Sequence, residues 1–223
     1  LSDISADPNK SGLSFELFLD WYYEPYILLS GTGTAYDCLA FAHEFGHFCC
    51  DYASWGSYAG MDVLEVFSQG MEYLSLCYGQ KDANIEKLKL LDCLRVYVEQ
   101  AAYASFEHQL YQLPAEELTA ERINGLYTQI CDNYGISSQM SYVLITHFYT
   151  NPMYIISYVV SNDLALQIYQ MEREDSGSGL KLYAEILPSQ DTYLLDFAQT
   201  YGRQRPCSPS RLQEVAELLK TVT

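Results

Sequence analysis

The sequence predicts a mainly α-helical fold that carries a short β element near its N-terminus. Along most of the chain, apolar residues recur at helical spacing within segments that end at glycine or proline. Nearer the N-terminus, Tyr26–Leu29 is a short apolar run between Pro25 and the loop Ser30–Gly33, which is typical of a strand. With 49% hydrophobic residues among 223, the chain can bury a sizeable core.

Two helices are expected directly after this strand. The first covers Thr34–Cys50, with Thr34 as its N-cap. The second covers Asp62–Cys77, with Gly79 as its stop signal.

The rest of the chain is interpreted as a series of helices. The longest, Ala83–Leu113, repeats apolar residues at Leu88, Leu91 and Leu94 and is broken by Pro114. Short helices are expected up to about residue 222. The helices between them are predicted at Thr119–Asn133, Ser138–His147 and Met153–Met171.

Composition excludes several classes of partner. Acidic residues number 29 and basic residues 12, which gives a net charge of −17. Such a surface repels nucleic acids and anionic membranes, so neither is expected as a partner. No apolar run reaches the length of a membrane span. The 7 cysteines are odd in number and form no C-x-x-C pair, which favours free thiols and a cytoplasmic location.

The first helix contains the pattern H-E-x-x-H, from His43 to His47. Residues four apart lie on one face of a helix, so the two imidazoles can hold one zinc ion. Glu44 would then lie beside the water that the metal activates, as a general base. A histidine on an apolar helix is also a common core residue, and a zinc site needs a third protein ligand.

Glu65 and Glu72 are the candidates on the second helix. They are seven residues apart and share one face, and a buried carboxylate needs a partner. Glu65 is interpreted as the third zinc ligand, and the alternative is a capping box in which Asp62 is the N-cap. Glu72 either supports a ligating histidine from behind or faces solvent.

Four features together resemble one family of zinc peptidases. They are the strand before a small-residue loop, the H-E-F-G-H pattern, the Glu-x-x-Ser element of Glu65 and Ser68, and a histidine–tyrosine segment that starts at His147. From about Lys10 onward, the chain resembles the catalytic half of the thimet-oligopeptidase and oligoendopeptidase F family. The histidine–tyrosine segment is more similar to the bacterial oligoendopeptidase F branch.

The resemblance implies a helical zincin-type catalytic domain with a deep channel for short peptides. It implies that His43, His47 and Glu65 bind one zinc ion and that Glu44 is the general base. In the family, a histidine and tyrosines of a later helix hold the scissile carbonyl and the oxyanion. The matching positions are His147, Tyr154 and Tyr158, with Tyr149 near the substrate, and Ile156 stands where family members often have a further tyrosine.

The expected function is therefore zinc-dependent hydrolysis of internal bonds in short peptides. The alternative is a non-catalytic helical peptide-binding module derived from such an enzyme. An H-E-x-x-H aminopeptidase is a third interpretation, but no acidic anchor for a free amine can be located.

We expect residues 1–223 to be the C-terminal catalytic domain of a longer, bacterial, cytoplasmic chain. Its N-terminal half would be a partner that completes the channel, so little activity is expected without it. We also expect one edge of Tyr26–Leu29 to be free beside the zinc, where an extended peptide could add.

Overall fold

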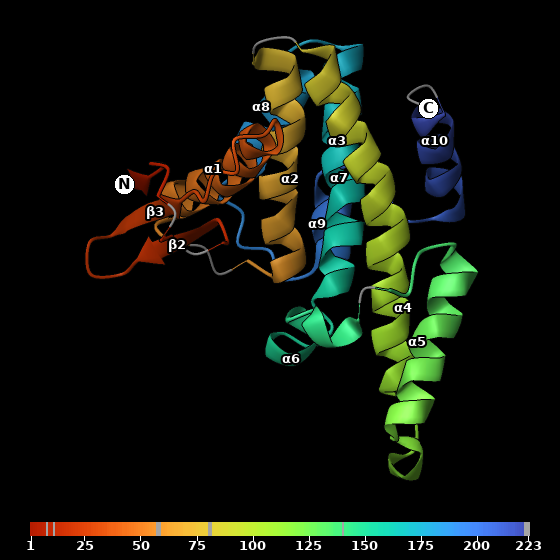
Figure 1. Cartoon of the computed structure of the whole chain (residues 1–223). Helices are drawn as coiled ribbons and strands as arrows, with labels where there is room; N and C mark the ends of the chain where they lie inside the picture. The colour runs from red at the N-terminus through yellow and green to blue at the C-terminus, as the bar shows by residue number, and fades with distance from the viewer. Residues whose placement is uncertain (8, 11, 57–58, 80–81, 140, 221–223) are drawn as a thin grey trace. The chain divides into compact units, whose positions relative to one another are not determined.

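The computed structural model describes residues 1–7, 9–10, 12–56, 59–79, 82–139 and 141–220. It is mainly helical with one small sheet near the N-terminus, which confirms the predicted fold class (Figure 1). The chain forms two compact units, one made of Leu1–Leu90 with Val160–Thr223 and one made of Leu91–Val159. Among the described residues, no helix has the length and apolar character needed to cross a bilayer.

The sheet has three strands in the order β1-β3-β2. Its central strand β3 (Glu24–Leu28) is parallel to β1 (Ser2–Asp3) and antiparallel to β2 (Phe15–Leu19). Both edges of β3 are therefore paired, and the prediction of a free edge on Tyr26–Leu29 is wrong. The cause is the pairing with β1, which joins residues far apart in sequence and leaves no mark on the local pattern of β3.

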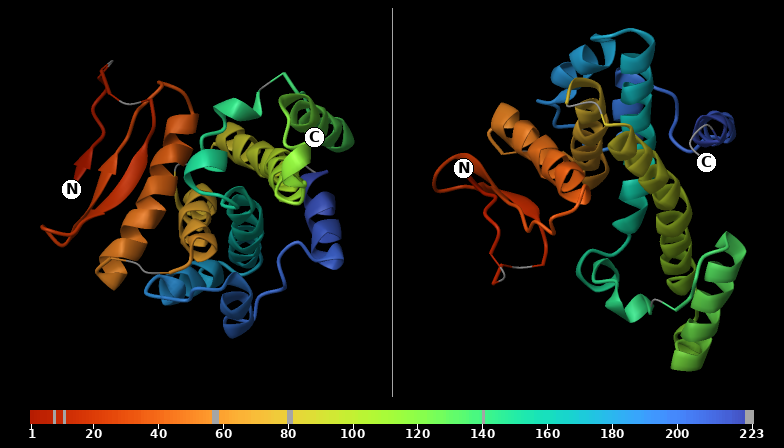
Figure 2. Two further views of the ribbon diagram at one scale, coloured as in Figure 1. Left: turned by 90° about the horizontal axis from the view of Figure 1, so that it is seen from below. Right: turned by 45° about the horizontal axis from the view of Figure 1, so that its top comes forward.

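Helix α1 (Tyr36–Ser54) lies against this sheet, as the separate views agree (Figures 1 and 2). Its N-cap is Ala35, which makes no side-chain cap bond, so the prediction that Thr34 caps the helix is wrong. Helix α2 (Met61–Tyr78) packs beside α1 and ends at Gly79, as expected.

The core of the first unit is built around α2. Apolar side chains from α1 and α2 meet those of α8 (Ser178–Ile186), α9 (Leu194–Thr200) and the later part of α7 (Ile155–Glu174). The Tyr183 hydroxyl donates to the Phe67 carbonyl over 2.8 Å, which ties α8 to α2. The last helix is α10 (Pro209–Leu219), whose buried Arg211 forms an ion pair with Asp163 of α7.

The second unit continues the long helical segment that starts with α3 (Ala83–Arg95). A π-helical stretch, Val96–Gln100, leads into α4 (Ala101–Leu110), and α5 (Ala120–Tyr134) packs beside α4. Thr119 caps α5, and its hydroxyl accepts from the Arg122 N–H. An aromatic and aliphatic cluster that includes Phe106, Tyr127 and Ile130 forms the core.

The helix predicted over Ser138–His147 does not form. In its place are a 3₁₀ turn, Tyr142–Leu144, and the short helix α6 (His147–Thr150). The Ser141 hydroxyl accepts from the Val143 N–H at the start of the turn, and such local bonds compete with regular helix. A further 3₁₀ turn, Ala115–Glu117, lies between α4 and α5.

Candidate metal centre

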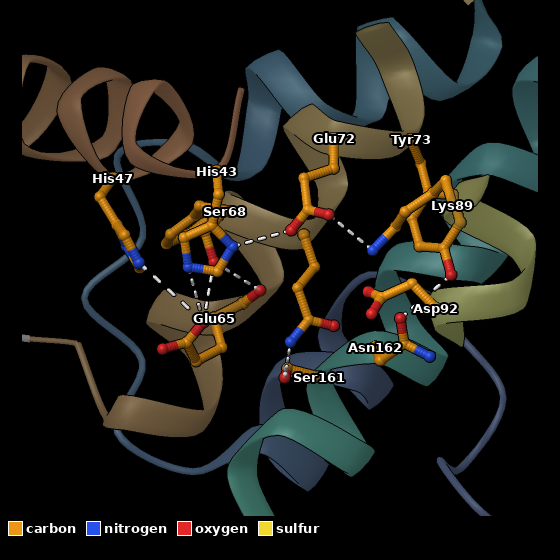
Figure 3. A network of polar contacts seen from close by, with 12 residues as sticks. His43, His47, Glu65, Ser68, Glu72, Tyr73, Lys89, Asp92, Ser161 and Asn162 are labelled. Carbon is orange, nitrogen blue, oxygen red and sulfur yellow. Dashed lines mark hydrogen bonds and ion pairs between the residues drawn. The ribbon is translucent and has the colours of Figure 1, made fainter. Parts of the chain in front are cut away.

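Two helices of the first unit bring three metal-binding side chains together (Figure 3). His43 and His47 project from α1 toward Glu65 of α2. The distance from Glu65 Oε2 is 3.5 Å to His43 Nε2 and 4.0 Å to His47 Nε2. One donor atom from each residue lies within 4.8 Å of the others, so the three predicted ligands converge on one point.

This convergence depends on a close crossing of α1 and α2. Gly46 lies on the buried face of α1, and a Cβ there would be 2.6 Å from the Ser68 Cα. No residue with a side chain fits at that distance, so glycine lets the two backbones touch. The crossing places Glu65 opposite the histidine pair.

Glu65 faces the two histidines and does not take part in a helix cap. Helix α2 begins at Met61 after Gly60, so Asp62 lies inside the helix and the capping-box alternative is excluded. Glu65 is 3% exposed, and the Ser68 hydroxyl donates a hydrogen bond of 2.9 Å to its Oε2. The Glu-x-x-Ser element thus fixes the carboxylate oxygen that faces the histidines.

Glu72 contacts His43, one of the candidate ligands, and does not face solvent. Its Oε1 lies 2.8 Å from His43 Nδ1, and its Oε2 lies 2.7 Å from Lys89 Nζ (Figure 3). When His43 Nδ1 donates to this carboxylate, Nε2 keeps the lone pair that a metal needs. The interpretation of Glu72 as a support for a ligating histidine therefore has the right geometry.

Electrostatics differ at the two histidines. Burial lowers the pKa of His43, but the hydrogen bond that His43 donates to Glu72 and the charge of Glu65 outweigh it and raise the pKa to about 9. Burial lowers the pKa of His47 to about 4. Burial also opposes the charge on Glu72, yet Lys89 and His43 hold the pKa of that carboxyl at about 2. Glu72 is therefore an acceptor at neutral pH, the role that a partner of a ligating histidine requires.

Glu44 lies on α1 next to His43, close enough to feel the charges of the site. Burial raises the pKa of its carboxyl, His43 lowers it, and the nearby Glu65 raises it again. The backbone N–H of Glu16 on β2 donates to the same carboxylate. The sheet therefore orients the candidate general base.

The donor set fits zinc. Two imidazole nitrogens and one carboxylate oxygen are a known set for catalytic zinc, which keeps a further position open. Ligand atoms about 2.0–2.1 Å from a tetrahedral zinc lie about 3.4 Å apart, and His43 Nε2 and Glu65 Oε2 are separated by 3.5 Å here. The His43 and His47 side chains remain 24% and 19% exposed, so a substrate can reach them.

The second unit gathers the histidine–tyrosine segment into one cluster. Tyr158 Oη lies 3.4 Å from His147 Nε2, and the ring of Tyr154 packs against both side chains, with ring centroids 5.1 Å and 4.9 Å away. His147 Nδ1 is buried without a hydrogen-bond partner in the described part of the chain. Tyr149 on α6 and Ile156 on α7 are exposed.

Lys89 is a site residue that the sequence analysis missed. It is 1% exposed on α3, where the predicted apolar stripe had placed Leu88, Leu91 and Leu94. Leu91 and Leu94 are instead 40% and 38% exposed. The available signal was a lysine between Leu88 and Leu90, one residue out of phase with the expected stripe.

Comparison with known proteins identifies the fold. No protein-family model matches the sequence, and no curated protein matches it either. A solved structure of an oligoendopeptidase F aligns with a TM-score of 0.85 at 21% identity, over 99% of this chain and 43% of that one. PZ peptidase A with an inhibitor aligns with a TM-score of 0.84 at 21% identity, again over 99% and 43%.

A third structure, an oligoendopeptidase F from Bacillus anthracis str. Ames, aligns with a TM-score of 0.80 at 19% identity, over 100% of this chain and 40% of that one. The chain therefore has the fold of one part of these peptidases and spans about two fifths of their length.

Proposed function

We propose that this chain carries the zinc centre and general base of an endopeptidase that cleaves internal bonds of short peptides. The observation that carries the proposal is the convergence of His43, His47 and Glu65 on one point, with Glu44 between the two histidines in sequence. Similarity of fold to oligoendopeptidase F structures supports the same reaction class.

The zinc ligands and Glu44 have separate roles in the proposed hydrolysis. A zinc ion held by His43, His47 and Glu65 would act as a Lewis acid toward water and the peptide carbonyl. Glu44 accepts the proton of the attacking water and returns it to the leaving amine. Burial shifts the pKa of its carboxyl upward, in the direction of the ambient pH, which favours proton transfer both to and from this group.

His147 and Tyr158 are proposed to donate hydrogen bonds to the carbonyl oxygen as negative charge develops on it. The support is their match to the family pattern and their position in one cluster of the second unit. Tyr154, which packs on both rings, and the exposed Tyr149 are proposed to contact the peptide. The side chain of Ile156 has no hydrogen-bond donor, so the hydroxyl donors of this segment would be the neighbouring tyrosines.

Because the chain spans about two fifths of the similar structures, full activity is proposed for a longer protein. The proposal includes short peptides as substrates, an N-terminal segment as the partner of this chain, and a cytoplasmic, bacterial setting.

Metal analysis followed by a cleavage assay tests the proposal. The purified chain, stripped with chelator and titrated with zinc, should bind one equivalent, and His47→Ala should weaken this binding. A longer protein that contains the chain should cleave internally quenched peptides, lose this activity to chelator and regain it with zinc. Zinc binding with peptide binding but no cleavage would favour the non-catalytic alternative, and absence of zinc binding would refute the site.

A further inference from the structure

Lys89 is a buried cation behind the candidate metal centre. Its side chain is 2% exposed, and Nζ lies 2.7 Å from Glu72 Oε2. The ammonium also lies over the ring of Tyr73, 4.6 Å from its centroid. The Tyr73 hydroxyl in turn donates to Asn162 Oδ1 over 3.0 Å, which holds the ring in place. Lys89 is thus seated in a defined position.

Three groups form a continuous polar chain that ends at the metal position (Figure 3). Lys89 contacts one carboxylate oxygen of Glu72, and His43 Nδ1 contacts the other over 2.8 Å. The far nitrogen of the same ring, His43 Nε2, faces Glu65. Both oxygens of Glu72 are therefore engaged, one by the ammonium and one by a ligand histidine.

The carboxylate needs the cation on geometric and electrostatic grounds. Glu72 is 6% exposed, and a buried carboxylate that lacks a charged partner turns toward water. This change would end its role as acceptor for Nδ1–H and would free the His43 ring to rotate away. The orientation of the His43 ring thus depends on Lys89, although Lys89 does not itself reach the metal position.

We propose that Lys89 is a positioning residue of the metal centre, acting through Glu72 to keep the Nε2 lone pair of His43 directed at the metal. This inference rests on the proposed zinc site. It predicts that Lys89 affects metal binding only while Glu72 is present. A purely structural ion pair would affect stability and leave the ligand field of the metal unchanged.

The test uses Lys89→Met, which keeps most of the length of the unbranched side chain and removes the charge. Zinc affinity of the 223-residue chain is measured by competition with a chromophoric chelator, and the bound geometry by the visible absorption of the cobalt-substituted chain. We expect zinc affinity to fall by about 10- to 100-fold and the cobalt spectrum to shift. The control is Lys87→Met, an exposed lysine on the same helix, which should change neither.

A second comparison isolates the route through Glu72. In the Glu72→Gln background, Lys89→Met should cause no further loss of zinc affinity, because the group through which it acts is absent. This double variant leaves no unpaired buried charge, so it remains informative if the single Lys89→Met chain unfolds. A further loss of affinity in the double variant would overturn the inference.

The remaining outcomes separate this inference from the proposed function. Unchanged affinity and an unchanged cobalt spectrum in Lys89→Met would overturn the inference while the zinc site stands. Failure of the unsubstituted chain to bind zinc would overturn both.

Discussion

Gly46 and Ser68 lie with their backbones in contact, since a methyl group on Gly46 would come within 2.6 Å of the Ser68 Cα. Gly46 stands between the two histidines of α1, and Ser68 holds the carboxylate of Glu65 on α2. The helix crossing and the metal centre are therefore one structural feature. Anything that separates these helices also separates the ligands.

Gly46→Ala should destabilise the fold and weaken zinc binding together. The added methyl group has only helix backbone to displace, and overpacking of this kind costs about 1–3 kcal/mol in the free energy of unfolding. Urea unfolding and zinc titration measure the two effects. The control is Gly125→Ala on α5, where a Cβ meets no atom within 4 Å. This change should stabilise by about 0.4–1 kcal/mol, and a neutral Gly46→Ala would refute the close crossing.

Glu44→Gln and Glu65→Gln should separate base from ligand. The amide at position 44 cannot take a proton, so a longer protein with this change should keep zinc and lose turnover. The amide at position 65 removes a charged donor, so zinc affinity should fall. Equilibrium dialysis with metal analysis distinguishes the two, and equal loss of zinc in both variants would contradict the assignment.

Glu16 should make the fold less stable as the pH rises. Burial, Asp51 and Glu44 raise the pKa of this carboxyl to about 8, and its Oε1 is buried without a hydrogen-bond partner in the described part of the chain. A folded-state pKa above the unfolded value of 4.5 favours the folded state below pH 4.5, and this contribution is lost between about pH 4.5 and 8.

Glu16→Gln removes that titration, so its free energy of unfolding should fall less than that of the unsubstituted chain between pH 5 and pH 8. Urea midpoints at the two pH values provide the measurement. Glu24→Gln, at an exposed position of the neighbouring strand, is the control and should follow the unsubstituted chain. Parallel behaviour of all three chains would show that Glu16 is not buried in this way.

Arg211→Met should be strongly destabilising. Arg211 Nε lies 2.5 Å from Asp163 Oδ1, and both side chains are buried, at 1% and 0% exposure. Removing the cation leaves a buried carboxylate that also accepts the Cys207 N–H, and such losses cost about 3–5 kcal/mol. Thermal or urea unfolding should show this, and Asp163→Asn added to Arg211→Met should recover part of it.

The control for this pair is the exposed ion pair of Lys220 and Glu217 near the end of α10. Lys220→Met should change the free energy of unfolding by at most about 0.5 kcal/mol. Similar effects of the buried and the exposed substitution would contradict the burial of Arg211.

Local sequence patterns were enough to predict which side chains converge at the candidate metal centre. His43 and His47 are four apart on a helix that the periodicity identifies, and Gly79 ends the next helix as its chemistry predicts. The structure also brings Glu65 to them and places Glu72 behind His43, because the seven-residue spacing puts both carboxylates on one face of α2. The face of a helix on which a side chain lies can therefore be predicted from its spacing in the sequence.

Contacts between residues that are far apart in the sequence could not be predicted from it. The pairing of β1 with β3 joins Ser2 to Ile27, and no residue pattern in either short segment indicates this pairing. Lys89 was missed for a related reason, since its burial depends on the meeting of α3 with Glu72 of α2. The helix predicted over Ser138–His147 failed because a side-chain bond of Ser141 favours a turn.

The first unit is encoded in two separate stretches of the chain, Leu1–Leu90 and Val160–Thr223. All three metal donors belong to the first stretch, yet Tyr183 and Phe197 of the second complete the core beneath α2. During synthesis, the three candidate metal ligands leave the ribosome before Tyr183 and Phe197, which support the helix that carries Glu65. The second unit lies between them in sequence and can fold in the interval, since domains generally fold as units. We therefore expect any metal ion to bind only after the stretch Val160–Thr223 has been synthesised.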